Sequence, residues 1–286
     1  MLLVGNYNKL EIDRITAKGA FLASDEEEIL LPGRLIPKDS QPGDIIDVFV
    51  YHDSEERLTA TTVRPRAVVG EFALMKVKDN VSVGTFLDWG LEKDLLLPFG
   101  EQLAPLRRGE QVLVRVYLHN SGRIAASAKL EKFLRPADDT VPEGAAVDLL
   151  VFALTDLGAK VIVNSSFSGL IFNNELYTKP ACGDKIPGYV KKIRDDGKID
   201  VTLRKGGAQE AEDDRELVLK TLKAGGGFLP LNDKSTPEAI SDLLRLSKKS
   251  FKKAIGGLYK EGLIEMNAEG IRLKTNAKVI RSGHFL

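Results

Sequence analysis

Short apolar runs separated by polar turns dominate the first 205 residues, and within the runs apolar and polar positions alternate. The clearest runs are residues 44–50 (DIIDVFV) and 111–117 (QVLVRVY). Both are rich in β-branched residues and are followed by Asp, Asn, Ser and Gly, which is typical of strands that end in turns. Short strands spaced at roughly ten residues favour small barrels over alternating strands and helices.

The strand pattern occurs three times along the chain. Equivalent landmarks lie 65 or 66 residues apart in the first two copies and 74 or 75 apart in the last two. A constant offset at several positions identifies an internal repeat. The landmarks are Gly5, Gly70 and Gly144 at the start of each copy, Gly19, Gly84 and Gly158 before the second strand, and Arg57, Arg123 and Lys198 before the last strand.

The C-terminal part of the chain has a helical pattern instead. Thr236 precedes a proline at a first helical position, and Ser247 is placed to cap the next helix. The order helix, strand, helix, helix, hairpin is that of a winged helix-turn-helix. The expected elements are helices over 210–224, from 237 and from 248, a short strand at 228–231, and a hairpin over 263–274.

The chain therefore divides into four units. We expect a multidomain protein, mainly β and then α+β, with three tandem five-stranded barrels followed by a winged helix-turn-helix. A barrel of about 65 residues buries only a modest share of its surface, so neighbouring barrels are expected to pack together across short linkers such as 135–139. The expected units span residues 1–64, 65–135, 141–205 and 209–276.

Composition indicates a globular, cytoplasmic protein. Hydrophobic residues make up 43% of the chain and charged residues 29%, which is ordinary for a soluble domain. No apolar run approaches the roughly 20 residues of a membrane span, and the N-terminus lacks the features of a signal peptide. The only cysteine, Cys182, excludes an internal disulfide, which fits a reducing compartment.

Charge is unevenly distributed, although the net charge is zero. The first 64 residues carry a net charge of −5 and residues 206–286 one of +3. The acidic run at 25–28 repels phosphate, so the first unit is expected to bind nucleic acid least and to contact a protein partner instead. Four lysines after Ser247 share one helix face, which suits a recognition helix; a merely solvated helix is the alternative. They are Lys248, Lys249, Lys252 and Lys253.

Several short motifs resemble a known family. Gly-Ala-Phe-Leu at 19–22, Leu-Leu-Pro at 30–32 and the basic residue before the last strand are similar to the S-one RNA-binding repeat, named after the largest protein of the small ribosomal subunit. Three such repeats followed by LPLNDKSTPEAI and LSKKSFKKAIGGLYKEGLIE resemble the conserved virulence factor B family along essentially the whole chain. The resemblance implies OB-fold barrels, a winged helix and an RNA-binding regulator of virulence-factor expression, without enzymatic activity.

The resemblance also implies a binding mode, in which bases stack on exposed rings and cations follow the phosphates. It places Phe21 and Phe86 at the second-strand aromatic position, with Val161 there in the third copy. For each phenylalanine, barrel core is the alternative. The stacking candidates are Phe21, Phe86, Trp89, Phe172 and Tyr189; the cationic candidates of the barrels are Arg57, Arg123, Lys191, Lys192, Arg194 and Lys198.

No enzyme signature accompanies these candidates. The glycines at 225–227 lack the lysine of a phosphate-binding loop, and three histidines with one cysteine make a zinc site improbable. We expect no metal and no cofactor. The expected partner is single-stranded RNA; the alternatives are duplex DNA, bound by the winged helix of a transcription regulator, and a scaffold role on the ribosome or RNA polymerase. Oligomeric state is left open.

Overall fold

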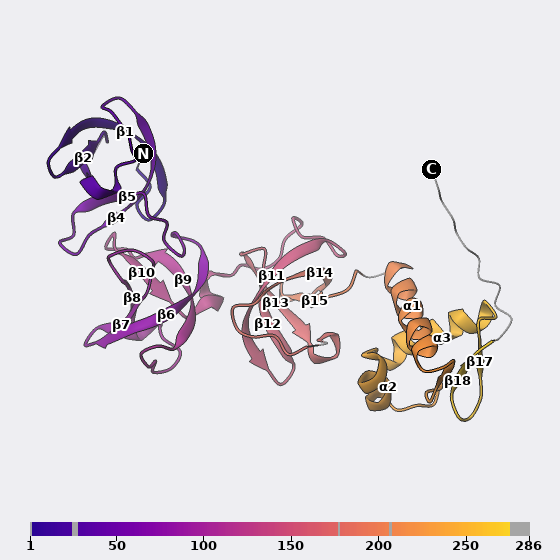
Figure 1. Cartoon of the computed structure of the whole chain (residues 1–286). Helices are drawn as coiled ribbons and strands as arrows, with labels where there is room; N and C mark the ends of the chain where they lie inside the picture. Colours follow the sequence, from indigo (N-terminus) through magenta and orange to yellow (C-terminus); the bar gives the residue numbers. More distant parts are fainter. Residues whose placement is uncertain (1, 25–27, 177, 206–207, 275–286) are drawn as a thin grey trace, which may run out of the picture.

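A row of four units forms the molecule (Figure 1). The computed structural model describes residues 2–24, 28–176, 178–205 and 208–274. Three five-stranded β units come first, and a helical unit with a small sheet follows. The first barrel lies against the second, the third lies beyond the second, and the helical unit occupies the far end of the row. The expected fold class is confirmed.

The three barrels share one topology. The first has the strand order β1-β2-β3-β5-β4, and the third repeats this order in β11-β12-β13-β15-β14; both close into barrels. The second has the same connectivity in the order β10-β9-β6-β7-β8. The strands are β1 Tyr7–Thr16, β2 Gly19–Leu22, β3 Ile29–Pro32, β4 Ile45–His52, β5 Leu58–Thr61, β6 Phe72–Val81, β7 Gly84–Leu87, β8 Leu95–Pro98, β9 Gln111–Leu118, β10 Ile124–Ser127, β11 Ala146–Thr155, β12 Gly158–Val163, β13 Phe167–Phe172, β14 Lys185–Ile193 and β15 Ile199–Thr202.

A bulge bends the long first strand of every barrel at the same place. It lies between Ile12 and Arg14 in β1, and the equivalent irregularities interrupt β6 and β11. Such a bulge increases the local twist, so one long strand can pair with the second strand at one end and with the fourth at the other. A short 3-10 helix follows the third strand of each barrel, and another follows the last strand of the second barrel. They are η1 Gly33–Leu35, η2 Phe99–Glu101, η3 Leu130–Phe133 and η4 Asn173–Glu175.

The glycine that begins each second strand is required for a steric reason. A Cβ atom on Gly19 would lie 2.1 Å from the carbonyl oxygen of Leu31, and one on Gly158 would lie 2.0 Å from that of Ile171. The second barrel repeats this approach at Gly84, 2.4 Å from the Leu97 carbonyl. Only a residue without a side chain lets the third strand pass this close, which explains why this landmark recurs in all three copies.

The helical unit has the predicted order and caps. It comprises α1 Ala208–Ala224, β16 Phe228–Leu229, α2 Pro237–Leu244, α3 Lys248–Lys260, β17 Ile264–Met266 and β18 Ile271–Leu273. The Thr236 hydroxyl accepts from the backbone N–H of Ala239 at 3.3 Å, and the Ser247 hydroxyl accepts from that of Ser250 at 3.0 Å. Phe251 and Ile255, on the inner face of α3, are buried. The unit is therefore a winged helix.

The first two barrels share one hydrophobic core. Phe49 and Tyr51 of β4 pack with Trp89 and the inner residues of the second barrel. The Trp89 ring meets Phe49 edge-on at 5.5 Å between ring centroids, and its Nε1 donates to the Ala67 carbonyl at 2.8 Å. With only 2% of its surface exposed, Trp89 cannot offer a face to a base. The prediction of a stacking role for Trp89 is wrong, because its neighbours come from another unit.

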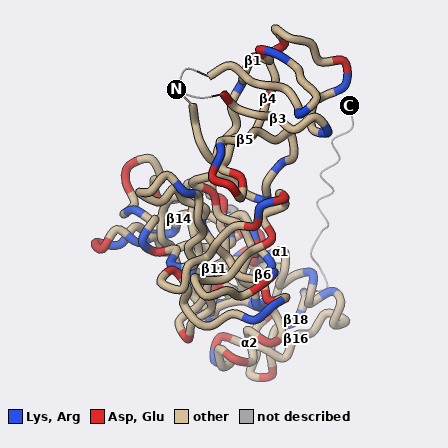
Figure 2. The backbone as a smooth tube through the Cα atoms, turned by 90° about the vertical axis from the view of Figure 1, so that its left-hand side faces the viewer, with Lys and Arg blue, Asp and Glu red and all other residues tan. Residues whose placement is uncertain are grey.

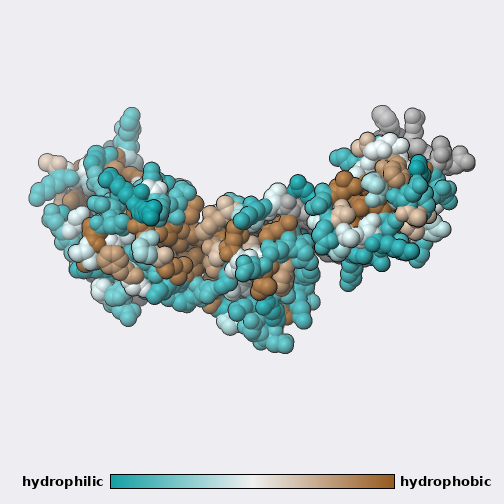
Figure 3. Space-filling view, turned by 90° about the horizontal axis from the view of Figure 1, so that it is seen from below, coloured by the Kyte–Doolittle hydropathy of each residue, from teal (hydrophilic) through white to brown (hydrophobic). Residues whose placement is uncertain are grey.

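A smaller apolar contact joins the second barrel to the third. Phe72, Leu113 and Leu130 of the second barrel pack with Ile162 of β12. The view from below shows hydrophobic side chains in a broken band along the row of units, bordered by hydrophilic ones (Figure 3). Packing between neighbouring barrels, expected from their small size, is thus a main feature of the fold.

The steric role of the second-strand glycine leads to a first prediction. Gly158→Ala should lower the free energy of unfolding by about 2–4 kcal/mol, because overpacking adds to backbone strain. Gly144→Ala is the matched control, since Gly144 also has a positive φ but has no atom within 4 Å of its added Cβ; its cost should be about 1–2 kcal/mol. Urea unfolding followed by far-UV circular dichroism measures both, and equal losses would contradict the steric explanation.

Candidate nucleic-acid interface

The second barrel presents an aromatic surface beside a cavity. Phe86 of β7 is half-buried and points outward, paired in register with Asp79 of β6 and Leu96 of β8. Together with Pro98 and with Tyr117 of β9, it lines a cavity of about 610 Å³. The predicted exposure of Phe86 follows from the alternation along β7. A half-buried ring beside a cavity can stack on a planar ligand.

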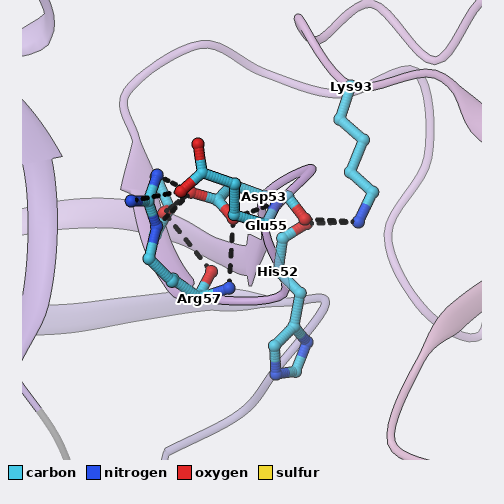
Figure 4. A network of polar contacts seen from close by, with 6 residues as sticks. His52, Asp53, Glu55, Arg57 and Lys93 are labelled. Atoms are coloured by element: carbon cyan, nitrogen blue, oxygen red, sulfur yellow. Dashed lines mark hydrogen bonds and ion pairs between the residues drawn. The ribbon is translucent and has the colours of Figure 1, made fainter.

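The opposite wall of the cavity belongs to the first barrel. His52, Ser54 and Glu56, at the end of β4 and in the turn to β5, line it. Lys93 of the second barrel reaches across and donates to the carbonyl oxygens of His52 at 2.9 Å and of Asp53 at 2.7 Å (Figure 4). Burial lowers the pKa of Lys93. These bonds hold the turn against the second barrel.

Asp53 organises the turn itself. Its carboxylate accepts from the Arg57 guanidinium at 3.0 and 2.7 Å and from the backbone N–H groups of Glu55 and Arg57 (Figure 4). Burial alone would raise the pKa of Asp53, but these hydrogen bonds lower it below its ordinary value. Arg57 also pairs with Glu55 at 2.6 Å. Its guanidinium is thus engaged by two carboxylates, which weakens the predicted attraction for phosphate.

Arg123 stands at the cavity and bridges the two barrels. Its Nε lies 3.0 Å from a carboxylate oxygen of Glu56, and 67% of its side chain is exposed. An ion pair between two exposed side chains is worth about 0–1 kcal/mol, so a phosphate can compete with Glu56 for the guanidinium. Arg123 therefore stays a predicted phosphate-binding residue, whereas the guanidinium of its counterpart Arg57 is held within its own turn.

A cation–aromatic cluster beside this cavity is missed by sequence reasoning. The Lys132 ammonium lies 5.2 Å from the ring centroid of Tyr117 and 4.9 Å from that of Phe133. Arg115 lies 4.8 Å from the Phe133 ring centroid. Lys132 and Phe133 belong to η3, after the last strand, where no element is expected from the sequence. The alternation along β9, which leaves Tyr117 half-exposed, is the signal that could have found the cluster.

The aromatic position of the first barrel is covered by a cation. Phe21 is half-buried, and the Arg14 guanidinium lies 4.2 Å above its ring centroid. Arg14 also pairs with Asp13 at 2.8 Å and Glu28 at 2.7 Å. The other acidic residues of the run, 25–27, lie outside the described residues. A base could reach Phe21 only by displacing this ion-paired arginine.

The third barrel corrects one assignment. In the third barrel, Lys160 of β12 pairs in register with Ala153 of β11. The equivalent pairs in the first two barrels are Phe21 with Arg14 and Phe86 with Asp79. Lys160, not Val161, therefore stands at the aromatic position, and Val161 is fully buried in the barrel. Lys160 pairs with Glu131 of the second barrel at 2.8 Å. The outer surface of β12 thus faces the second barrel.

Most predicted cations of the third barrel have acidic partners. Lys191 pairs with Glu175 at 2.5 Å, Arg194 with Asp200 at 2.7 Å and Lys198 with Asp196 at 3.4 Å. Lys192 is exposed and has no ion pair within the described part of the chain. Phe172 and Tyr189 are both half-buried. Lys and Arg are interspersed with Asp and Glu over the barrels (Figure 2). The surface formed by these residues of the third barrel is therefore only weakly cationic.

The α3 face is more strongly cationic. Lys249, Lys252 and Lys253 are exposed and Lys248 is half-buried, while the opposite face of α3 is buried in the winged-helix core. Across residues 208–274, none of these four lysines forms an ion pair. The predicted lysine face therefore exists as a surface of unneutralised charge.

No helix among the described residues is long and apolar enough to span a membrane. Over the same residues, no group of three or more His, Cys, Asp or Glu side chains could hold a metal ion. Cys182 is a free thiol whose Sγ donates to the Phe152 carbonyl at 3.4 Å, and burial raises its pKa.

Comparison with known proteins agrees with this architecture. A model of the CvfB-like winged helix domain matches residues 216–273, and a model of the S1 domain matches residues 4–63 and 69–129. The chain is 31% identical to the uncharacterized protein YitL of Bacillus subtilis over 91% of this chain and 90% of that protein. It is 25% identical to conserved virulence factor B of Staphylococcus epidermidis over 95% of each.

A solved structure also aligns along the chain. It is a multidomain protein with nucleic acid binding domains from Streptococcus pneumoniae, 25% identical, covering 95% of this chain and 98% of that one with a TM-score of 0.41. The matched S1 domains support nucleic-acid binding.

The Asp53 network leads to a second prediction. Asp53→Asn should lower the free energy of unfolding at pH 7 by about 1–2 kcal/mol, because charged hydrogen bonds are removed. A carboxylate whose folded pKa is lowered stabilises the fold above its unfolded pKa of about 3.9, and this contribution is lost as pH falls through the folded pKa. The difference from the unmodified chain should therefore shrink below about pH 4.

Glu55→Gln is the control for this effect. The Glu55 side chain is 71% exposed, so its pairing with Arg57 should contribute little to stability. Denaturant unfolding of both variants between pH 3 and pH 7 measures the difference. A pH-independent loss in Asp53→Asn would contradict a role for the carboxylate charge.

Proposed function

We propose that this chain, which belongs to the conserved virulence factor B family, is a post-transcriptional regulator. It binds single-stranded RNA and catalyses no reaction. The observation that carries the proposal is Phe86, an outward ring on an S1-type barrel beside a cavity. Bases stack on such rings for roughly 1–3 kcal/mol each. In a duplex the bases already stack on one another, so a single strand is the better ligand.

Phosphate attraction comes mainly from the winged helix. The lysines of α3 have no acidic partners in the described residues, so binding a polyanion breaks no ion pair there. Binding by such a surface releases counterions and weakens as salt is added. In this proposal, the aromatic surface of the second barrel binds bases and the lysine face of α3 binds phosphates.

The first barrel is expected to contribute least to RNA affinity. Its aromatic ring is covered by Arg14, and its acidic residues disfavour phosphate. Contact with a protein partner is the better role for its outer surface. The RNA ligand implies a cytoplasmic site of action, and the names of the relatives suggest that the regulated genes include virulence factors.

Duplex DNA is the second candidate ligand. In helix-turn-helix proteins the recognition helix lies in the major groove, and α3 has the required division into a buried apolar face and an exposed cationic face. A transcription regulator of this kind would use the barrels for protein contacts. A scaffold on the ribosome or RNA polymerase is the third candidate, for which the barrels alone would suffice.

Fluorescence anisotropy separates these functions. We expect the full chain to bind single-stranded RNA more tightly than duplex DNA of equal length, with affinity falling as salt rises. Lys249→Gln combined with Lys253→Gln should reduce the slope of log affinity against log salt by about 1.4, because each phosphate neutralised on a single strand adds about 0.7 to that slope.

Lys220→Gln combined with Lys223→Gln is the matched control. These exposed lysines lie on α1 of the same unit, and their substitution removes the same charge. The control should leave the salt slope close to that of the unmodified chain. Tighter binding of duplex DNA would replace the RNA proposal by the transcription-regulator function, and equal slopes for the two double variants would exclude a specific role for α3.

A further inference from the structure

The cavity between the first two barrels is a composite site. Its volume of about 610 Å³ falls in the range of roughly 300–1,000 Å³ that is usual for small-ligand sites. Neither barrel forms it alone, because His52, Ser54 and Glu56 come from the first barrel and the remaining walls from the second. The shared core around Trp89 and the bonds of Lys93 fix the two walls relative to each other.

The second-barrel wall suits a planar, uncharged group. Phe86, Leu96 and Pro98 form an apolar surface on β7 and β8, and Tyr117 adds a second ring from β9. A nucleobase has this chemistry, with an apolar face for stacking and polar edges for hydrogen bonds.

Each carboxylate of the cavity already has a cationic partner. Three carboxylates line it, and each has a cation: Glu56 pairs with Arg123 at 3.0 Å, Asp94 with Lys78 at 2.7 Å, and Glu92 with Arg34. Lys93, the other cation of the lining, donates to the carbonyl oxygens of His52 and Asp53, so a neutral base fits the interior better than a bare anion. Arg123, two-thirds exposed, is the cation from which a phosphate outside the interior can displace a carboxylate.

We propose that this cavity binds one nucleotide, with its base against Phe86 and its phosphate at Arg123, so that the first barrel supplies a wall of the site. This inference rests on the proposed function, since the natural source of the nucleotide is an unstacked position in a single-stranded RNA. A free nucleoside monophosphate shares the same chemistry. The Arg123–Glu56 ion pair opens on binding, which couples ligand entry to the contact between the barrels.

The single tryptophan of the chain is a built-in probe for this site. Trp89 is the only tryptophan in the sequence and lies behind the cavity, in the core shared by the two barrels. Its fluorescence should therefore change in a saturable way when the full chain is titrated with a single-stranded RNA hexamer. Titrations with AMP and with UMP form the second arm, which distinguishes a free nucleotide from one within RNA.

Variants test the two contacts separately. Phe86→Ala should weaken the binding reported by Trp89 roughly tenfold, because the ring that stacks on the base is removed. Arg123→Gln should weaken it less and reduce its dependence on salt. Phe99→Ala and Arg107→Gln are the matched controls, because both residues are exposed on the same barrel and neither lines the cavity. Circular dichroism and thermal unfolding verify that each variant is folded.

The outcomes separate this inference from the proposed function. RNA binding by anisotropy with no change in Trp89 fluorescence, and with no loss in Phe86→Ala or Arg123→Gln, overturns the pocket and leaves RNA binding intact. A saturable response to AMP or UMP without RNA binding supports the pocket and overturns the RNA function. Equal losses in the controls and in the pocket variants also overturn the pocket.

Discussion

The packing of Trp89 between the first and second barrels is the contact on which the rest of the arrangement depends. A barrel of this size buries too little apolar surface to be very stable alone, and a large aromatic residue shared between two barrels extends the core of both. The contact places the β4–β5 turn against the second barrel, where Lys93 holds it. The cavity beside Phe86 exists because these two units are joined in this way.

Packing between units makes three similar repeats unequal. The second barrel keeps an open aromatic surface, the third turns β12 toward its neighbour through Ile162, and the first has Arg14 over its ring. The cationic residues also differ between the units. Most of those predicted on the barrels form ion pairs with carboxylates, whereas the lysines of α3 form none within the described residues. The surfaces available for binding are therefore those that are not used in contacts between the barrels.

Local features of this fold can be predicted from sequence because their causes are local. The glycine that begins each second strand depends on the next strand of the same barrel, and the caps Thr236 and Ser247 depend on residues one helical turn ahead. The surroundings of Trp89 come from β4, some forty residues earlier in the chain, so its burial cannot be predicted locally. The Val161 assignment is wrong by one residue, because the aromatic lies two positions after the glycine in the first two copies and the same count from Gly158 leads to Lys160. Ion-pair partners such as Glu56 for Arg123 join separate units, and no sequence pattern indicates them.

Unequal exposure, rather than similarity between the repeats, decides where nucleic acid is expected to bind. Ultraviolet crosslinking of a single-stranded RNA to the full chain, followed by mass spectrometry of the linked peptides, tests this central claim most directly. We expect crosslinks at Phe86 and Tyr117 of the second barrel and on the lysine face of α3. Crosslinks concentrated on β12 of the third barrel, or spread evenly over equivalent positions of all three barrels, would contradict it.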